Sequence, residues 1–259
     1  MNIVVLVKQV PDSGSERTLR PEDSTVDRDT ANLVINEMDE YALEEALKLR
    51  EAHGGEVTVL TMGPEKATEA IRKALSMGPD KAVHVTDPAL RGSCAVTTSK
   101  VIAKALGTLE WDLVLCGAES TDGQVAAMPA MLAQRLGVAA LTGARKLDVD
   151  GQTLTIERQT EDGYQVVQAA GPAIVSVWDT INEPRYPSFK GIMQAKSKPV
   201  TTLTLAELGI DAGDVGLPAA TSSVVEFAPR PPKQAGVKIV DEGDGGLKLV
   251  EYLAAEKIV

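Results

Sequence analysis

The stretch LVLCGAESTDGQVAAMPAMLAQRLG, residues 113–137, indicates how this chain folds. Its first three residues, LVL, form an apolar run, which is typical of a strand covered on both faces. A loop of small and hydroxyl residues follows, and then an apolar-periodic segment that predicts a helix from about residue 125 to residue 136. A strand, a loop and a helix in this order form the repeating unit of a parallel α/β sheet.

The same unit recurs towards the N-terminus. The predicted strands cover residues 3–7, 56–63, 81–87 and 111–117. The predicted helices between them cover residues 36–53, 67–78 and 93–109. Strands that alternate with helices of about 10 to 15 residues are typical of a doubly wound sheet. We therefore predict a mostly parallel α/β sheet that is Rossmann-like and similar in layout to the adenine nucleotide alpha hydrolases.

The pattern changes after residue 144. Apolar and polar residues alternate up to residue 177, and Asp-Gly pairs interrupt them at residues 150–151 and 162–163, which predicts an added antiparallel hairpin region.

From residue 182 the chain is rich in proline and basic residues, and it has few strong element signals before a short helical pattern near its end. We therefore expect a nucleotide-binding α/β domain over residues 1–189, with a recognition loop at residues 182–193. Residues 190–259 are expected to be an extended C-terminal arm that has no core of its own and packs on a partner.

Composition excludes several classes of protein. The 259 residues carry a formal net charge of −11, whereas nucleic-acid binding needs a basic surface. Two cysteines and two histidines are too few for a disulfide framework or for a site built on those ligands. The N-terminus begins with a predicted strand and not with a targeting signal, and no apolar run approaches the roughly 20 residues of a membrane helix. We therefore expect a cytoplasmic protein without nucleic-acid binding or membrane insertion.

The carboxyl ends of the predicted strands form the candidate binding edge, because ligands of doubly wound sheets bind there. After the fourth strand come Ser120 and Thr121, then Gly123 and the free N–H groups of the following helix, which together suit a phosphate. Asn36 begins a helix beside the same edge. An adenine nucleotide would fit, with its base near the first two strands and its phosphate at residues 120–125. The alternative is an ordinary strand-to-helix turn with hydroxyl caps.

No catalytic group stands out elsewhere. The chain has neither a G-x-G-x-x-G after its first strand nor a G-x-x-x-x-G-K-[ST] loop, which argues against a dinucleotide-binding dehydrogenase and a Walker-type phosphate site. We interpret Cys116 as a packed small apolar residue, His53 as a helix-terminal side chain and His84 as a half-buried one. We interpret the acidic residues between positions 37 and 45 as a solvated helix face, with metal ligation as a minor alternative. The sequence offers no acid–base pair.

Several motifs together resemble the electron-transfer flavoprotein beta subunit. The segment IERQTEDGYQVVQAAGPAIVSV, residues 156–177, is similar to the signature of that family. Its defining positions are filled by Arg158, Glu161, Asp162, Gly163, Gln165 and Pro172. VLVKQVPD, NEMDEYALEEALKL, TMGP, ALSMG and INEPRYPSFKGIMQAKSKP also resemble family segments, and they occur in family order. The resemblance extends from residue 1 to about residue 238.

The resemblance implies a heterodimer with an alpha subunit that holds the working FAD, whereas the beta subunit binds AMP in a structural role. Carried over by position, the residues around the nucleotide are Leu6, Asn36, Glu37, Met38, Asp39, Met62, Ser120, Thr121, Asp122, Gly123, Gln124 and Val125. The family accepts electrons from acyl-CoA dehydrogenases or other flavin dehydrogenases and passes them to a quinone oxidoreductase or another acceptor. The resemblance implies an electron carrier that catalyses no reaction of its own.

The resemblance also implies a partner-binding residue. In the family, an apolar side chain of the recognition loop inserts into a pocket of the dehydrogenase. The residue at that place is Phe189, and Arg185 and Lys190 would supply charge near it.

Three alternatives remain open. In electron-bifurcating members the beta subunit binds a second FAD, and their loop usually reads Asp-Gly-Asp-Thr-x-Gln-Val where this chain has DGQVA at residues 122–126, which favours AMP. An adenine-nucleotide hydrolase or ligase of the same fold carries a Ser-Gly-Gly-x-Asp-Ser loop, of which residues 13–15 preserve a fragment. The hairpin region and the long arm argue against a regulatory domain of the universal-stress type.

Overall fold

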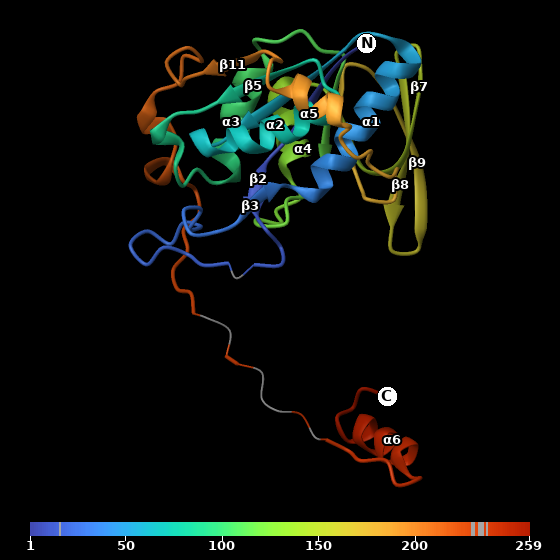
Figure 1. Ribbon diagram of the computed structural model, residues 1–259. Coiled ribbons are helices and arrows are strands. Elements are labelled where there is room, and N and C mark those ends of the chain that lie inside the picture. The colour runs from blue at the N-terminus through green and yellow to red at the C-terminus, as the bar shows by residue number, and fades with distance from the viewer. Residues whose placement is uncertain (16, 229–230, 233–235, 237) are drawn as a thin grey trace. The chain divides into compact units, whose positions relative to one another are not determined.

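A computed structural model describes residues 1–15, 17–228, 231–232, 236 and 238–259 (Figure 1). The chain forms two compact units, Met1–Ser223 and Val224–Val259. The first unit contains a large sheet with helices on both of its faces, and the second contains one helix.

The first unit is built on a nine-stranded sheet with the strand order β11-β5-β4-β1-β6-β10-β7-β8-β9. The strands are β1 (Asn2–Leu6), β4 (Glu56–Met62), β5 (Lys81–Val85), β6 (Leu113–Gly117), β7 (Ala139–Asp150), β8 (Thr153–Thr160), β9 (Gly163–Ala170), β10 (Ala173–Val177) and β11 (Val200–Leu203). Neighbours from β11 to β7 pair in parallel, whereas β7, β8 and β9 pair antiparallel. The predicted mostly parallel sheet with an antiparallel hairpin region is confirmed.

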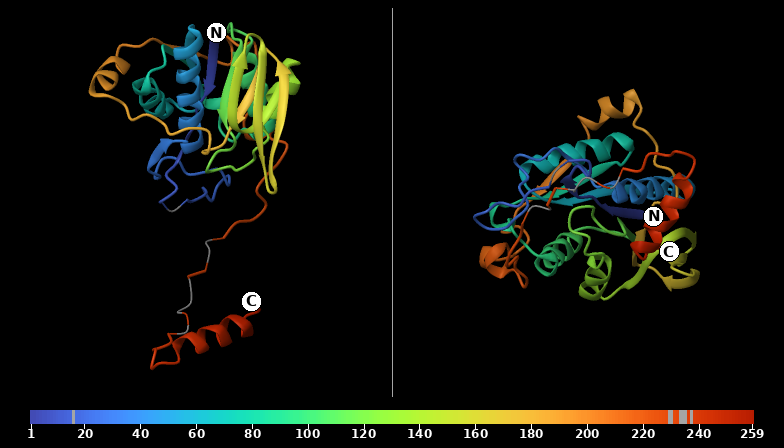
Figure 2. Two further views of the ribbon diagram at one scale, coloured as in Figure 1. Left: turned by 90° about the vertical axis from the view of Figure 1, so that its right-hand side faces the viewer. Right: turned by 90° about the horizontal axis from the view of Figure 1, so that it is seen from below.

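Helices cover both faces of this sheet (Figure 2). They are α1 (Glu37–His53), α2 (Thr68–Met77), α3 (Ala95–Leu106), α4 (Met128–Leu136) and α5 (Phe189–Ala195). Successive side chains of a strand point to opposite faces, so Val5 of β1 joins the core beneath α1 and α2, and Val4 joins the core beneath α3 and α4. Burial on both faces explains why the central strands are continuous apolar runs.

Smaller elements complete the first unit. A separate antiparallel pair consists of β2 (Gln9–Pro11) and β3 (Leu33–Ile35). Short 3₁₀ turns occur at Glu65–Ala67, Pro88–Leu90, Ala212–Asp214 and Leu217–Ala219.

The segment after residue 189 differs from the coreless arm that the sequence predicted. β11 lies within it and pairs in parallel with β5, and Leu205, Leu208 and Val215 are buried in the core beneath α3 and α4. The first compact unit therefore extends to Ser223. The sequence signal was weak because β11 has only four residues and takes its hydrogen-bond partners from a strand that is distant in the sequence.

The second unit contains α6 (Gly245–Ala255), where the sequence predicted a terminal helix. None of its residues is buried, and the side chains of Leu247 and Val250 are 64% and 58% exposed. Among the described residues, no helix is both long enough and apolar enough to cross a membrane.

Candidate functional site

Three neighbouring strands bring the predicted nucleotide-binding residues to one edge of the sheet. β4, β1 and β6 are adjacent and parallel, and they end at Met62, Leu6 and Gly117. After β1 the chain adds β4 and β5 on one side, and it then crosses to β6 on the other side. Ligands of doubly wound sheets bind outside the carboxyl ends of the strands at such a reversal.

The β6–α4 loop, residues 118–127, is tied to the start of α1 by Asn36. The side-chain amide of Asn36 donates to the carbonyl oxygen of Glu119 at 3.1 Å, and its Oδ1 accepts from the backbone N–H of Thr121 at 3.1 Å. Asn36 also donates to Asp39 at 2.9 Å. Both side chains are buried, so these two residues hold the loop from beneath.

Asp39 joins three chain segments through one carboxylate. Besides the bond from Asn36, it accepts from the backbone N–H of Lys8 at 2.8 Å and from that of Gly117 at 3.3 Å. Burial raises the pKa of Asp39 to about 7, although these hydrogen bonds and the charge of Lys8 act in the opposite direction. A Cβ added at Gly117 would lie 2.5 Å from the Cβ of Met38, so α1 packs directly on the start of the loop.

Asp122 of the loop forms ion pairs with two cationic side chains. Its carboxylate lies 2.6 Å from Lys8 Nζ and 3.0 Å from a terminal nitrogen of Arg28, and Lys8 also donates to Ser120 Oγ at 3.2 Å. Burial alone would raise the pKa of Asp122, but Lys8, Ser120 and Arg28 together lower it to about 2. Two cations against one carboxylate leave this group with a net positive charge.

The backbone of the loop adopts conformations that most side chains avoid. Gln124 and Ala126 have φ angles of 48° and 54°. The left-handed region costs an L-residue roughly 1–2 kcal/mol, and such strain is concentrated at functional sites. α4 begins at Met128, later than the predicted residue 125, because the chain makes this left-handed turn before it becomes helical.

Backbone donors lie free at the end of the loop. Within the part of the chain that the structure describes, the N–H groups of Val125, Ala126 and Ala127 donate no hydrogen bond, and no side chain caps α4. The side chain of Val125 is 54% exposed, as expected at an open edge. Free N–H groups at a helix N-terminus, beside the net positive charge of Lys8 and Arg28, suit an anionic group such as a phosphate. The residues present therefore fit the phosphate of a nucleotide.

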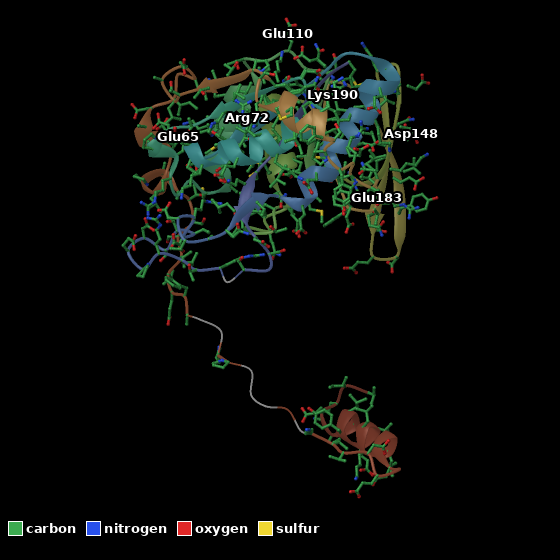
Figure 3. The ribbon with its side chains drawn as sticks, viewed as in Figure 1. Glu65, Arg72, Glu110, Asp148, Glu183 and Lys190 are labelled. Carbon is green, nitrogen blue, oxygen red and sulfur yellow. The ribbon has the colours of Figure 1, made fainter. Side chains whose placement is uncertain are left out.

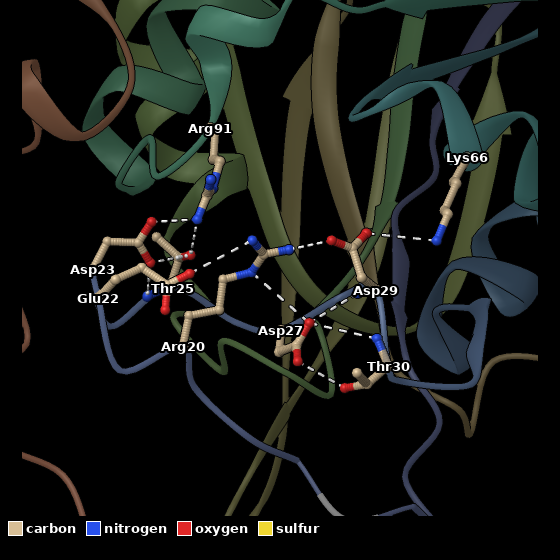
Figure 4. A network of polar contacts seen from close by, with 9 residues as sticks. All are labelled: Arg20, Glu22, Asp23, Thr25, Asp27, Asp29, Thr30, Lys66 and Arg91. Carbon is tan, nitrogen blue, oxygen red and sulfur yellow. Dashed lines mark hydrogen bonds and ion pairs between the residues drawn. The ribbon is translucent and has the colours of Figure 1, made fainter.

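A polar network holds the described part of the N-terminal segment that connects β2 to β3 and crosses this edge (Figure 4). Arg20 pairs with Asp29, which lies 3.5 Å from Lys66 Nζ, and Arg91 pairs with Asp23. The network fixes the segment to the turns that precede α2 and α3.

Sequence reasoning missed the basic residues that this segment and the chain after β1 supply. Arg17 donates to the carbonyl oxygen of Thr121 at 2.6 Å, and Arg28 and Lys8 bind Asp122, although 94 to 114 residues separate the partners. Lys8 directly after the first strand was the one available signal. Of the other predicted nucleotide contacts, Glu37 is exposed and accepts from Ser13 Oγ at 3.3 Å.

Two of the predicted partner-binding residues, Phe189 and Lys190, begin α5, which packs against α2. Figure 3 labels Lys190 there, beside Arg72 of α2. Phe189 is 81% exposed, and Lys190 is exposed beside it. A hollow of about 570 Å³ adjoins this segment and is lined by Arg72, Lys73, Ser76, Tyr186, Pro187, Ile192, Ala195 and Lys196. Residues 189–195 form a helix and not the predicted loop, because the Ser188 hydroxyl accepts from the N–H of Gly191 at 3.0 Å and caps it.

Arg185 binds within the chain. Its guanidinium lies 2.7 Å from Glu44 and 2.6 Å from Glu51, both on α1, and the hydrogen bonds to these carboxylates raise the pKa of Arg185. Glu44, Glu45 and Asp39 are buried. The prediction of a solvated acidic face was therefore wrong for these three residues, because the segment after Ile181 covers part of α1 and the strand ends cover Asp39.

The remaining candidates have structural roles. Cys116 is buried and donates to the carbonyl oxygen of Val175, and burial raises the pKa of its thiol. His84 is buried more deeply than predicted, with Nε2 3.1 Å from the carbonyl oxygen of Gly63, and burial lowers its pKa. His53 ends α1, as predicted. Among the described residues, no group of three or more His, Cys, Asp or Glu side chains could hold a metal ion.

Comparisons with known proteins identify the family of this chain. The electron transfer flavoprotein domain model matches residues 23–208. Electron transfer flavoprotein subunit beta of Mycobacterium leprae (strain TN) is 54% identical over 264 residues, which cover 100% of this chain and 99% of the relative. The subunit beta of Mycobacterium tuberculosis (strain ATCC 25618 / H37Rv) is 53% identical with the same coverage. The subunit beta of Thermoanaerobacterium thermosaccharolyticum is 39% identical over 237 residues, or 91% of each chain.

Proposed function

The chain belongs to the electron transfer flavoprotein family, with beta subunits related to it along its whole length, and from this premise we propose that it works as the beta subunit of a heterodimeric electron carrier. An alpha subunit completes the dimer and holds most of the FAD. FAD supplies the electron-accepting chemistry when it is bound. This chain supplies a structural nucleotide site and the surface that docks electron donors.

The β6–α4 loop is the observation that carries the nucleotide site. Its free N–H groups, its two left-handed residues Gln124 and Ala126, and the charge of Lys8 and Arg28 lie at the reversal of the sheet. The phosphate of AMP binds to these N–H groups, and the base lies towards Leu6 and Met62. Asn36 and Asp39 hold the loop in shape from beneath.

AMP is favoured over a second FAD because of the loop itself. The DGQVA sequence at residues 122–126 lacks the second Asp and the Thr of the bifurcating pattern. The side chain of Asp122 is 5% exposed and engaged by two cations, so it holds the loop closed and is not free for a ligand. The bifurcating form remains the second candidate function.

The exposed Phe189 is the docking residue for electron donors. Acyl-CoA dehydrogenases or other flavin dehydrogenases receive it in a pocket, and the carrier passes its electrons to a quinone oxidoreductase or another acceptor. Its 81% exposure supports this assignment, since an aromatic side chain of that size is normally buried. The whole cycle takes place in the cytoplasm.

Co-expression with the alpha subunit tests the proposal. The purified complex should contain both chains and bound FAD, and a flavin-dependent acyl-CoA dehydrogenase with its substrate should bleach the flavin absorbance under anaerobic conditions. The alpha subunit alone is the control and should react much more slowly. Failure of the two chains to associate, together with ATP hydrolysis by this chain, would instead support the adenine-nucleotide hydrolase alternative.

A further inference from the structure

The segment that precedes Phe189 is bound to α1 through buried carboxylates. Glu44 accepts three hydrogen bonds from Arg185: from its backbone N–H at 3.1 Å, from Nε at 2.7 Å and from a terminal nitrogen at 2.9 Å. Three residues earlier, Asn182 donates to Glu45 and to the carbonyl oxygen of Tyr41, both at 3.0 Å. The chain from Asn182 to Arg185 is therefore fixed on one face of α1.

The chain that follows Phe189 is bound to α2. Arg72 donates to the carbonyl oxygens of Ala195 and Lys198 at 2.6 Å and 3.1 Å. Lys198 in turn donates to the carbonyl oxygen of Leu75 at 3.1 Å. Phe189 thus lies on a short bridge that is held at both ends, although its own side chain is 81% exposed.

We propose that Glu44, acting through Arg185, is a positioning residue that fixes Phe189 for the electron donor. The inference rests on the proposed docking role of Phe189 and adds to it. A flexible segment must be ordered when its partner binds, whereas a segment already fixed to α1 avoids that loss of entropy. Arg185 thereby acts inside the subunit. Its charge, which was predicted to lie near the partner, pairs with Glu44 instead.

Glu44 matters more than Glu51, although both bind Arg185. The side chain of Glu44 is 8% exposed and that of Glu51 is 53% exposed. Ion pairs in solvent contribute little, whereas a buried, bidentate carboxylate holds an arginine in one orientation. The structure thus supplies a matched control. Glu51→Gln removes one negative charge beside the same guanidinium, but it keeps the buried, bidentate pair of Arg185 with Glu44.

The test uses the complex with the alpha subunit, an acyl-CoA dehydrogenase and its acyl-CoA substrate. Steady-state kinetics are measured with the flavoprotein as the varied substrate, for Glu44→Gln, Glu51→Gln, Phe189→Ala and the double variant. Glu44→Gln should raise KM roughly three- to tenfold with little change in kcat, since only the ordering of the docking segment is lost. Glu51→Gln should change KM less than about twofold.

The double variant separates the two claims. If Glu44 acts through Phe189, Glu44→Gln should raise KM no further once Phe189 is alanine. A KM unchanged by Phe189→Ala would remove the docking role itself. A KM raised by Phe189→Ala but not by Glu44→Gln, or additive effects, would overturn only the positioning role.

Arg185→Gln is a second variant of the same pair, and it controls for a folding defect in Glu44→Gln, because Arg185 is only half-buried. It should raise KM as Glu44→Gln does, and trypsin should cleave after Lys190 faster in both variants than in wild type. Loss of FAD or a much lower melting temperature in both would show that the pair only stabilises the fold, which contradicts the proposal.

Discussion

At the scale of single residues, Asp39 organises the edge where the nucleotide is proposed to bind. One buried carboxylate accepts from Asn36, Lys8 and Gly117, and so joins the start of α1 to the ends of β1 and β6. All three neighbours are donors, which favours the ionised form, while burial favours the protonated form and raises the pKa to about 7. Stability should therefore depend on pH through this group.

The direction of that dependence follows from the two pKa values. The pKa of an Asp in an unfolded chain is about 3.9. Between pH 4 and 7, Asp39 of the folded protein therefore holds a proton that the unfolded chain has released. The stability from this proton is fully present below pH 4 and is lost as pH rises through 7. Asp39→Asn cannot titrate at this position. From pH 5 to pH 7 the unfolding free energy of wild type should therefore fall, relative to that of the variant, by on the order of 1–2 kcal/mol. Melting curves at pH 5, 6, 7 and 8 measure it, and a gap that is constant with pH contradicts the assignment.

The sequence identified these residues but not their orientation. The resemblance selected Asn36 and Asp39 as nucleotide neighbours, and the structure places them at that edge with their side chains turned into the protein. Cys116 could be interpreted from its apolar surroundings alone. Lys8, Arg17 and Arg28 could not be assigned, because their partners lie about a hundred residues away and become neighbours only when the sheet forms.

At the scale of elements, the position of α5 depends on one glycine. A Cβ at Gly191 would lie 2.4 Å from the carbonyl oxygen of Ser76 in α2, a backbone atom that cannot move aside easily. Gly191→Ala should therefore push α5 away from α2 and destabilise the protein by roughly 1–3 kcal/mol. Gly246→Ala in α6 is the control, because nothing lies within 4 Å of its added Cβ. Equal melting temperatures for both variants would show that α5 does not need this close approach.

Elements with a clear apolar periodicity of their own could be predicted from the sequence. Elements that are stabilised only by contacts with distant parts of the chain could not. The helices α1 to α3 and the central strands show clear apolar patterns, and the Asp-Gly pairs predict the turns after β7 and β8. β11 and α5 lie in a proline-rich stretch without such a pattern. Their stability comes from β5 and α2, so no local signal predicts them.

At the scale of the whole molecule, the chain separates into a self-sufficient unit and a helix without a core. Among the described residues, the buried side chains of the two apolar cores extend no further along the chain than Val215, and α6 has no buried residue. Deleting residues 230–259 should therefore leave the melting temperature of the first unit nearly unchanged. The apolar face of α6 needs a partner surface, so the truncated chain should co-purify poorly with the alpha subunit.

Two point variants refine that prediction. Val250→Glu places a charge on the exposed apolar face of α6 and should weaken association as the deletion does. Glu251→Gln changes the neighbouring polar position and should leave association intact. Undiminished binding of the truncated chain, measured by calorimetry against the alpha subunit, would assign the subunit contact to the first unit alone.

The central proposal is that the β6–α4 loop binds AMP. The direct measurement is the nucleotide content of the purified heterodimer, released by denaturation and separated by chromatography, for wild type, Gly123→Ala and Gly123→Pro. A Cβ at Gly123 meets nothing closer than 3.5 Å, whereas proline removes the N–H that donates to Asp122 and distorts the turn. We predict one AMP and one FAD per wild-type and Gly123→Ala dimer, and a clear loss of AMP with retained FAD for Gly123→Pro. Two FAD per dimer, or AMP unaffected by the proline, would contradict the account.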